Sequence, residues 1–396
     1  MGGNARWAIT AVFATNGLLV ASIAARAPSV KVDLGLSAGQ LGLATAAFGI
    51  AAVAAMQGAG ALAARFGSRR VVRVAVSLLP AALFGTALAG DLLSLAAAFL
   101  LVGMVHGVLD VTQNAHAVAV ERELGRSILN GCHAAWSIGA VGGSLLASGA
   151  AQLGLSRAVH FGVLALVLTP VAAVWTRALL PAGADRTARA ERAPRARWSR
   201  PLVLLGAMGA TVLTVEAAVA NWSGIFLHER LAAPLGLAAV GYVAFTASQT
   251  AGRLVGDRLL ARRAPHELLR AGVLVAAAGL VLVVVSPWPG LAIAGFAVVG
   301  IGLATPLPVL FGAAGHLGGT EAAATVARFS TMTYAGILLA PPIIGAVADQ
   351  VGLTWTLAAL APLLAAVAAA DLRVLTAGQA PAAAAATRST ARDIAV

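Results

Sequence analysis

The feature that most constrains this chain is a series of long apolar runs. A helix needs about 20 apolar residues to cross the ~30 Å hydrocarbon core of a bilayer, and twelve such runs follow one another along the 396 residues. They cover residues 7–25, 39–63, 71–90, 92–119, 128–153, 158–180, 201–227, 236–260, 267–286, 289–312, 323–348 and 353–375. Because only helices or closed barrels satisfy backbone polar groups in lipid, and these runs are too long for barrel strands, the sequence predicts an all-α membrane protein with twelve transmembrane helices.

The scarcity of charge excludes other classes of protein. Only 11% of the residues are charged, whereas a soluble protein has about 25%. That is too few to cover the surface of a cytosolic enzyme, and an apolar fraction of 60% excludes a disordered chain. Cys132 is the single cysteine, so neither an intrachain disulfide nor a cysteine-based metal cluster can form.

The arginines predict how the helices are oriented. With both termini on one side, 21 of the 27 basic residues fall in the segments on that side and 4 on the other, and Arg253 and Arg328 lie within spans. Since basic residues concentrate in cytoplasmic segments, both termini are predicted to be cytoplasmic. The net charge of +12 then reflects orientation and contact with anionic lipid, so no nucleic-acid partner is needed.

The chain divides into two similar halves. A polar stretch at 181–200 follows the sixth span, and we expect it to be a cytoplasmic linker between six-helix bundles at 1–180 and 201–376. Residues 377–396 are expected to form a disordered cytoplasmic tail. The arginines at 65, 69 and 70 recur at 258, 262 and 263, which indicates a parallel repeat. Such repeats bind solutes near the bilayer midplane, at the interface of the halves.

One loop resembles the signature of a known family. The segment Gly60-x-Leu62-x-Ala64-Arg65-x-Gly67-Ser68-Arg69-Arg70 resembles the G-x-L-x-D-R-x-G-R-R loop of the major facilitator superfamily. In that family the Asp caps a helix end in the other half and helps to hold one conformation, but here Ala64 takes its place. The second copy keeps the acid at Asp257, followed by Arg258.

Further segments resemble a bacterial branch of this superfamily that is distantly related to the fucose permeases. They are Asp110-x-x-x-Asn114, Glu121, His133-x-x-Trp136-Ser137-x-Gly139, Glu216-x-x-x-x-Asn221-Trp222-Ser223 and Pro341-Pro342-x-x-Gly345. The resemblance implies a secondary active transporter of two six-helix bundles, located in the bacterial inner membrane and working by alternating access. It covers nearly the whole chain.

Two acids in the middle of predicted spans are candidates for proton coupling. A charged group at membrane depth costs roughly 2.5–3.5 kcal/mol on insertion scales, so such residues are functional suspects. Asp110 shares a helix face with His106, Gln113 and Asn114, and Glu216 lies in the first helix of the second half. Desolvation disfavours a charged carboxylate, so each acid could bind and release a proton. The alternative for each is a structural hydrogen bond to a neighbouring helix.

Other polar and aromatic residues within the spans are candidates for solute binding. The set is Asn16, His106, Asn114, His133, Trp136, Asn221, Trp222 and Gln249. Histidine and the amides could hydrogen-bond a solute, and tryptophan could stack on a ring. The alternatives are contacts between helices and, for Asn221 and Trp222, an anchor at the membrane interface.

A third group of residues is expected to gate the solute path. Besides the signature loop it includes the ion-pairing residues of the second half. The set is Gly60, Arg65, Gly67, Arg69, Arg70, Arg253, Asp257, Arg258 and Arg328. Ion pairs near the cytoplasmic end would form and break as the halves move.

The motifs that are absent narrow the function. The chain has no H-E-x-x-H, G-x-S-x-G or G-x-x-x-x-G-K-[ST] motif, which argues against an enzyme or an ATP-driven pump, and we expect no cofactor and no metal. We therefore predict a monomeric, proton-coupled importer of a small polar, sugar-like solute. The alternatives are an efflux pump of the same fold, or a membrane sensor or scaffold that transports nothing.

Overall fold

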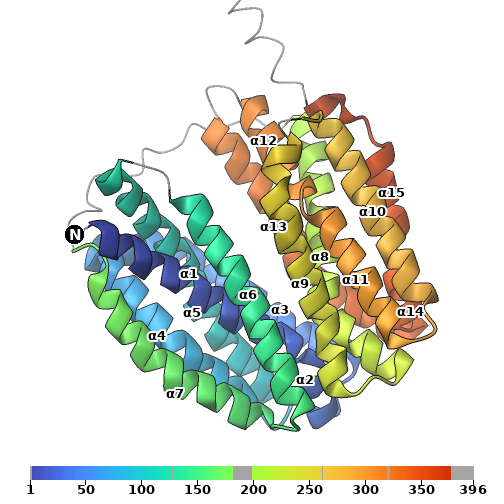
Figure 1. The fold of residues 1–396 in the computed structure, drawn as a ribbon, viewed down its shortest axis with the longest axis horizontal. Helices are drawn as coiled ribbons and strands as arrows, with labels where there is room; N and C mark the ends of the chain where they lie inside the picture. Colours follow the sequence, from blue (N-terminus) through green and yellow to red (C-terminus); the bar gives the residue numbers. More distant parts are fainter. Residues whose placement is uncertain (1, 126–127, 182–198, 261, 319–321, 376–396) are drawn as a thin grey trace, which may run out of the picture.

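The chain folds into a set of long helices (Figure 1). The computed structural model describes residues 2–125, 128–181, 199–260, 262–318 and 322–375. Within these ranges the α-helices are α1 (Gly2–Ala25), α2 (Ala27–Leu34), α3 (Ala38–Phe66), α4 (Ser68–Ala87), α5 (Leu92–Leu124), α6 (Leu129–Gln152), α7 (Arg157–Trp175), α8 (Arg200–Leu231), α9 (Leu235–Leu260), α10 (Pro265–Val285), α11 (Pro289–Leu303), α12 (Pro306–Gly318), α13 (Ala322–Val351), α14 (Leu353–Ala358) and α15 (Leu360–Ala369). None of the described residues forms a β-strand, which confirms the predicted all-α fold.

These helices account for the twelve apolar runs. Ten helical stretches in the described ranges are long and apolar enough to cross a membrane, with α11 and α12 counted as one. The other two predicted spans correspond to α9, which carries Arg253 near its end, and to α14 and α15, which break at Ala359. The short helix α2, between the first two spans, was not predicted.

Local sequence signals set several helix ends. Ser37 and Gln40 form a capping box at the start of α3, and Asp91 and Ser94 form one at the start of α5. Gly67 joins α3 directly to α4 with φ of +81°, a conformation that favours glycine. These ends place the arginines around Gly67 at one end of the long helices.

Glycines allow neighbouring helices to pack backbone against backbone. A Cβ on Gly103 would lie 2.2 Å from the carbonyl oxygen of Phe48, and one on Gly107 would lie 2.3 Å from that of Ala52. The structure thus places α3 directly against Gly103 and Gly107 of α5. Small residues at helix interfaces are typical of membrane bundles.

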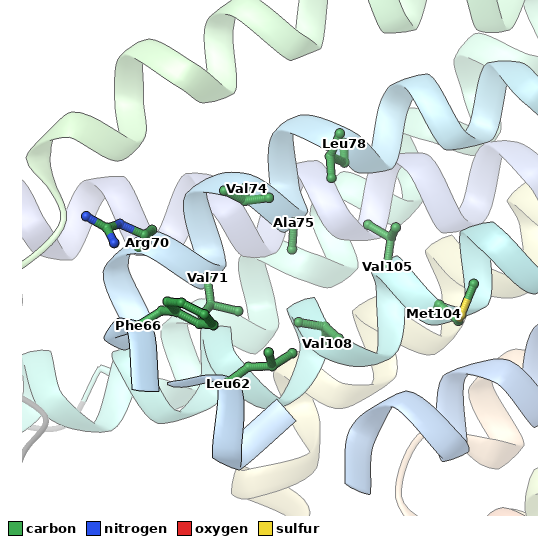
Figure 2. A pocket seen from close by; sticks show the side chains of 10 residues that line it. All are labelled: Leu62, Phe66, Arg70, Val71, Val74, Ala75, Leu78, Met104, Val105 and Val108. Atoms are coloured by element: carbon green, nitrogen blue, oxygen red, sulfur yellow. The ribbon is translucent and has the colours of Figure 1, made fainter. Parts of the chain in front are cut away.

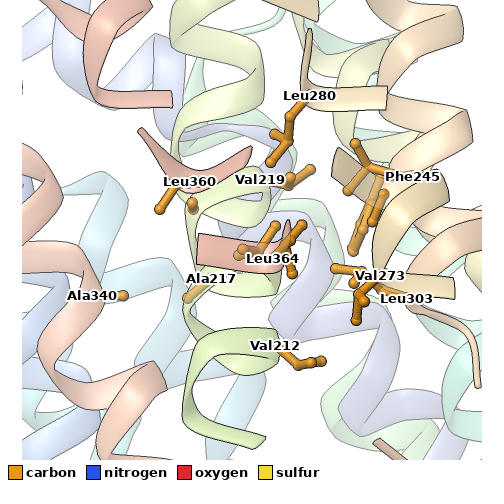
Figure 3. Packing of buried hydrophobic residues seen from close by; sticks show 14 of the residues in the cluster. Val212, Ala217, Val219, Phe245, Val273, Leu280, Leu303, Ala340, Leu360 and Leu364 are labelled. Atoms are coloured by element: carbon orange, nitrogen blue, oxygen red, sulfur yellow. The ribbon is translucent and has the colours of Figure 1, made fainter. Parts of the chain in front are cut away.

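The helices form two groups, which we call the N half (α1–α7) and the C half (α8–α15). In the C half, α8, α9, α10, α11 and α15 enclose a buried core that includes Val219, Phe245 and Leu364 (Figure 3). The two halves lie together at the end marked by α2 and α14 and diverge toward the end marked by α12 (Figure 1). The predicted bounds of the linker and tail fall mainly outside the described residues and stay predictions.

Candidate functional site

The polar residues of the N half gather on α1, α5 and α6. Asn16 is fully buried on α1, and its Oδ1 accepts a hydrogen bond of 3.0 Å from His106 Nδ1 on α5. One turn further along α5, Asp110 Oδ1 accepts a 3.3 Å hydrogen bond from Gln113 Nε2. His133 on α6 has an exposed side chain. Its ring makes an edge contact with the ring of Phe13 on α1, with 5.2 Å between the ring centroids. Three helices thus contribute to one polar group.

The C half contains a matching acid on α8. Glu216 Oε1 accepts a 2.9 Å hydrogen bond from Gln249 Nε2 on α9 and lies 3.9 Å from Arg253 Nη2 on the same helix. We predicted Gln249 to bind solute and Arg253 to act as a gate, and the structure places both beside Glu216. Tyr242 on α9 is buried within electrostatic range of Glu216 and Arg253.

The two polar groups face each other across the interface of the halves. His133 lies within electrostatic range of Asp110, which belongs to the same N half, and of Arg253, which belongs to the C half. Tyr334 on α13 of the C half lies within range of Asp110. We call this set the central polar cluster. Its members are Asn16, His106, Asp110, Gln113, His133, Glu216, Tyr242, Gln249, Arg253 and Tyr334.

Two predicted solute-binding asparagines bond to their own helices. Asn114 Nδ2 donates to the backbone oxygen of Asp110 at 2.8 Å, and Asn221 Nδ2 donates to that of Ala217 at 2.8 Å. Because each amide is partly exposed and uses only its nitrogen in these bonds, its oxygen is available to another donor.

The two predicted tryptophans lie in different surroundings. Trp136 is partly buried and packs against the hydrophobic cores of both halves. Trp222 is 0% exposed and belongs to the buried core of the C half. This burial favours a packing role for Trp222, and its contact with solute stays a prediction.

The signature loop lies at one end of the molecule, away from the central polar cluster. Arg65 stands over the ring of Phe66 at 5.1 Å, and Arg69 donates a hydrogen bond to the backbone oxygen of Arg177. Arg70 is exposed. We call this the basic end.

Three other predicted gating residues are only partly described. Arg328 is half-buried near the start of α13, and the side chains of Asp257 and Arg258 lie outside what the structure describes. Gly60 has open space beside it, since a Cβ there would meet nothing within 4 Å.

The opposite end joins the two halves through Asp349, at the end of α13. Its carboxylate accepts hydrogen bonds from Ser37 Oγ at 2.7 Å and from the backbone nitrogens of Ala38 and Gly39, both at 2.9 Å. These groups form the start of α3, where a negative charge is favoured by the helix dipole. We call this end the closed end and this arrangement the Asp349 latch.

Close packing accompanies the latch. Gly42 and Gly345 allow α3 and α13 to pack closely. A Cβ on Gly42 would lie 2.3 Å from the carbonyl oxygen of Pro341, and one on Gly345 would lie 2.4 Å from that of Ala38. Nearby, Lys31 on α2 forms an ion pair with Glu229 on α8. Sequence reasoning missed Asp349 because its partners lie more than 300 residues away.

Tyr242 and Tyr334 were also missed. A tyrosine at membrane depth reads as an ordinary packing or interfacial residue until the opposite helix is known. Among the described residues, no group of three or more His, Cys, Asp or Glu is placed to hold a metal ion.

Comparison with known proteins identifies the fold. The model of the Major Facilitator Superfamily matches residues 8–327. An uncharacterised MFS-type transporter of Yersinia pestis is 32% identical over 89% of this chain and 91% of its own length. The membrane protein MosC of Rhizobium meliloti is 28% identical over 87% of this chain and 84% of its own length.

Solved structures agree with the sequence relatives. The nucleoside transporter NupG superposes with a TM-score of 0.74 at 16% identity, over 95% of this chain and 99% of its own. A D-xylose–proton symporter superposes with a TM-score of 0.71 at 14% identity, over 91% and 97%. Together with the helical architecture and the family match, these similarities show that the chain belongs to the major facilitator superfamily of transporters.

Proposed function

We propose that this chain takes up a small polar, sugar-like solute together with protons across the bacterial inner membrane by alternating access. The observation that carries this proposal is a pair of carboxylates at membrane depth, one in each half, each hydrogen-bonded to a glutamine. Asp110 pairs with Gln113, and Glu216 pairs with Gln249. Acids at such positions are typical of proton-coupled transporters.

The surroundings of the two acids suggest how protons would move. In the proposed cycle both carboxylates bind protons on one side of the membrane, the neutral state allows the halves to rock, and the protons leave on the other side. Arg253, 3.9 Å from Glu216, favours the charged carboxylate and so assists release of its proton.

Unsatisfied polar atoms in the central polar cluster favour a hydroxyl-rich solute. Within the described residues, Asn16 Nδ2 and Gln113 Oε1 are buried without a hydrogen-bond partner. A buried polar atom left unpaired costs about 1–3 kcal/mol, which a bound hydroxyl group or a water molecule would recover. One atom is a donor and the other an acceptor, and a sugar hydroxyl can serve both roles. Two of the structural neighbours are a nucleoside transporter and a D-xylose–proton symporter, and both names fit a solute of this kind.

The basic end is proposed to be cytoplasmic. Arg65, Arg69 and Arg70 lie at the junction of α3 and α4, and Arg177 follows α7 on the same side. The positive-inside rule then places both termini in the cytoplasm and the Asp349 latch on the outer side. The structure would correspond to an inward-facing state. Since one chain supplies both halves of the cluster, we propose a monomer as the working unit.

The experiment begins by finding a solute. Purified protein is screened by thermal shift against pentoses, hexoses, cyclitols, nucleosides, organic acids and common drugs, and a solute that raises the melting temperature is loaded into proteoliposome assays. The wild type should accumulate this solute when an inward proton gradient is imposed. Asp110→Asn should lose that accumulation yet keep counterflow exchange, because exchange requires no net proton movement.

A matched control separates coupling from general loss of charge. Glu123→Gln removes an exposed acid from the end of the same helix and should accumulate solute like the wild type. Full accumulation by Asp110→Asn would contradict the assigned role. If only drugs raise the melting temperature of the protein, and cells that overexpress it become resistant to those drugs, an efflux pump would be favoured. Binding without any flux would favour the sensor or scaffold.

A further inference from the structure

The outer surface of the N half contains an apolar groove at the basic end (Figure 2). It has a volume of about 330 Å³ and lies between the end of α3, the start of α4 and the middle of α5. Its lining contains one charged side chain, Arg70. The other lining residues are Leu62, Phe66, Val71, Val74, Ala75, Leu78, Met104, Val105 and Val108.

The groove is separate from the central polar cluster. On α5, Met104, Val105 and Val108 line the groove, whereas His106 and Asp110 belong to the cluster. At 100° per residue these two sets fall on opposite faces of the helix. A molecule in the groove would therefore contact the membrane-facing side of α5 and not the proposed solute path.

The length and exposure of the groove match one lipid chain. Arg70 and Leu78 lie eight residues apart on α4, which is about 12 Å of helix, and one leaflet of the hydrocarbon core is about 15 Å thick. Phe66 is 41% exposed and Val74 is 53% exposed, so the groove is open toward the bilayer. In Figure 2 the Arg70 side chain lies at one end of the row formed along α4 by Val74 and Leu78.

The charge around the groove selects for an anion. Between Asp33 and Asp91 the sequence contains four arginines, at 65, 69, 70 and 73, and no acidic residue. Arg69 is engaged by the backbone oxygen of Arg177, whereas Arg70 is exposed at the end of the groove. A guanidinium group forms paired hydrogen bonds with a phosphate group.

We propose that this groove binds an anionic phospholipid of the membrane, with one acyl chain between α3, α4 and α5 and the phosphodiester against Arg70. The apolar lining takes the chain and the unopposed arginine takes the headgroup. A zwitterionic lipid offers the same chain, but its headgroup carries no net charge, so the arginine should discriminate between the two.

The test measures lipid binding to the purified full-length protein by native mass spectrometry. Phosphatidylglycerol and phosphatidylcholine with identical acyl chains are titrated against the wild type and three variants. Arg70→Gln removes the headgroup contact, and Val74→Trp fills the mouth of the groove at an exposed position. Arg263→Gln removes an exposed arginine from the C half as a matched control.

The wild type should bind one phosphatidylglycerol about fivefold more tightly than phosphatidylcholine, the ratio expected for one arginine near anionic lipid. Arg70→Gln should abolish that preference, Val74→Trp should weaken both lipids, and Arg263→Gln should match the wild type. Equal binding of the two lipids by the wild type, an unchanged preference in Arg70→Gln, or an equal loss in Arg263→Gln would overturn the proposal. Should Val74→Trp fail to fold, the paired arginine variants decide alone.

Discussion

Removal of the Asp349 latch should open the closed end of the molecule. The carboxylate accepts three hydrogen bonds from the start of α3, at 2.7, 2.9 and 2.9 Å, and Asp349 and α3 belong to different halves. A buried hydrogen bond to a charged group is worth about 1.5–3 kcal/mol, but Asp349 is exposed, so we expect about 1–2 kcal/mol for the three bonds and the helix dipole together. This free energy is lost when the halves separate at this end. Asp349→Ala should therefore shift the conformational equilibrium about 5–30-fold toward the state open at that end.

The shift can be measured by electron paramagnetic resonance between two spin labels at the closed end. Gly90 of the N half and Gln350 of the C half are exposed and can be replaced by cysteine once Cys132, the single cysteine, is changed to serine. In Asp349→Ala the longer distances should gain population. Asp371→Ala, which removes an exposed acid outside the latch, should leave the distribution unchanged. If both variants give the wild-type distribution, the latch does not hold the closed end.

Substitutions at three further positions test other parts of the structure. Gly345→Val places a side chain where even a Cβ would lie 2.4 Å from the backbone oxygen of Ala38, so the same spin labels should report separation of the halves, and an unchanged distance would argue against close packing there. Trp222→Ala should lower the free energy of unfolding by about 3–5 kcal/mol because the side chain is 0% exposed, whereas Trp222→Phe should keep most of the stability and bind solute normally in a thermal-shift assay. Loss of solute binding by Trp222→Phe at unchanged stability would instead support the direct role predicted from the sequence. Hydrogen bonds from Ser94 hold the pKa of Asp91 below its ordinary value of 3.8. The ionised Asp91 carboxylate therefore stabilises the folded state above pH 3.8, and this stabilisation is lost as the pH falls below that value. Thermal unfolding of Asp91→Asn should accordingly lose part of this acid dependence, and an identical pH profile would contradict the assignment.

The helices were predictable because lipid leaves few choices. A run such as 39–63 must form a helix to satisfy its backbone, and α3 extends only a few residues beyond that range. The unpredicted helix α2 is short and carries Lys31 and Asp33, so it lacks the length and apolarity that identify a span. The break between α14 and α15 has a signal in Pro362, whose missing N–H and ring disfavour a continuous helix through Ala358 and Ala359, but the long apolar run concealed it.

The candidate site was predictable residue by residue but not as a set of contacts. The cost of charge in lipid singled out Asp110, Glu216 and Arg253 from the sequence alone. Gln249 and Arg253 are four residues apart and therefore share one face of α9, and Arg253 was predicted to act in a gate. That spacing carries no information on which residue of α8 stands opposite, and the structure brings Arg253 to Glu216. Asp349 could not be found for the same reason, since its partners belong to the other half.

The most direct test of the account is the movement of protons with solute. Proteoliposomes containing the pH indicator pyranine receive an inward gradient of the solute identified by thermal shift, with no imposed proton gradient. We predict that the lumen of wild-type vesicles acidifies as solute enters, and that solute still exchanges in Asp110→Asn and Glu216→Gln without acidification. Wild-type solute flux without any pH change, or unchanged acidification in both variants, would contradict it.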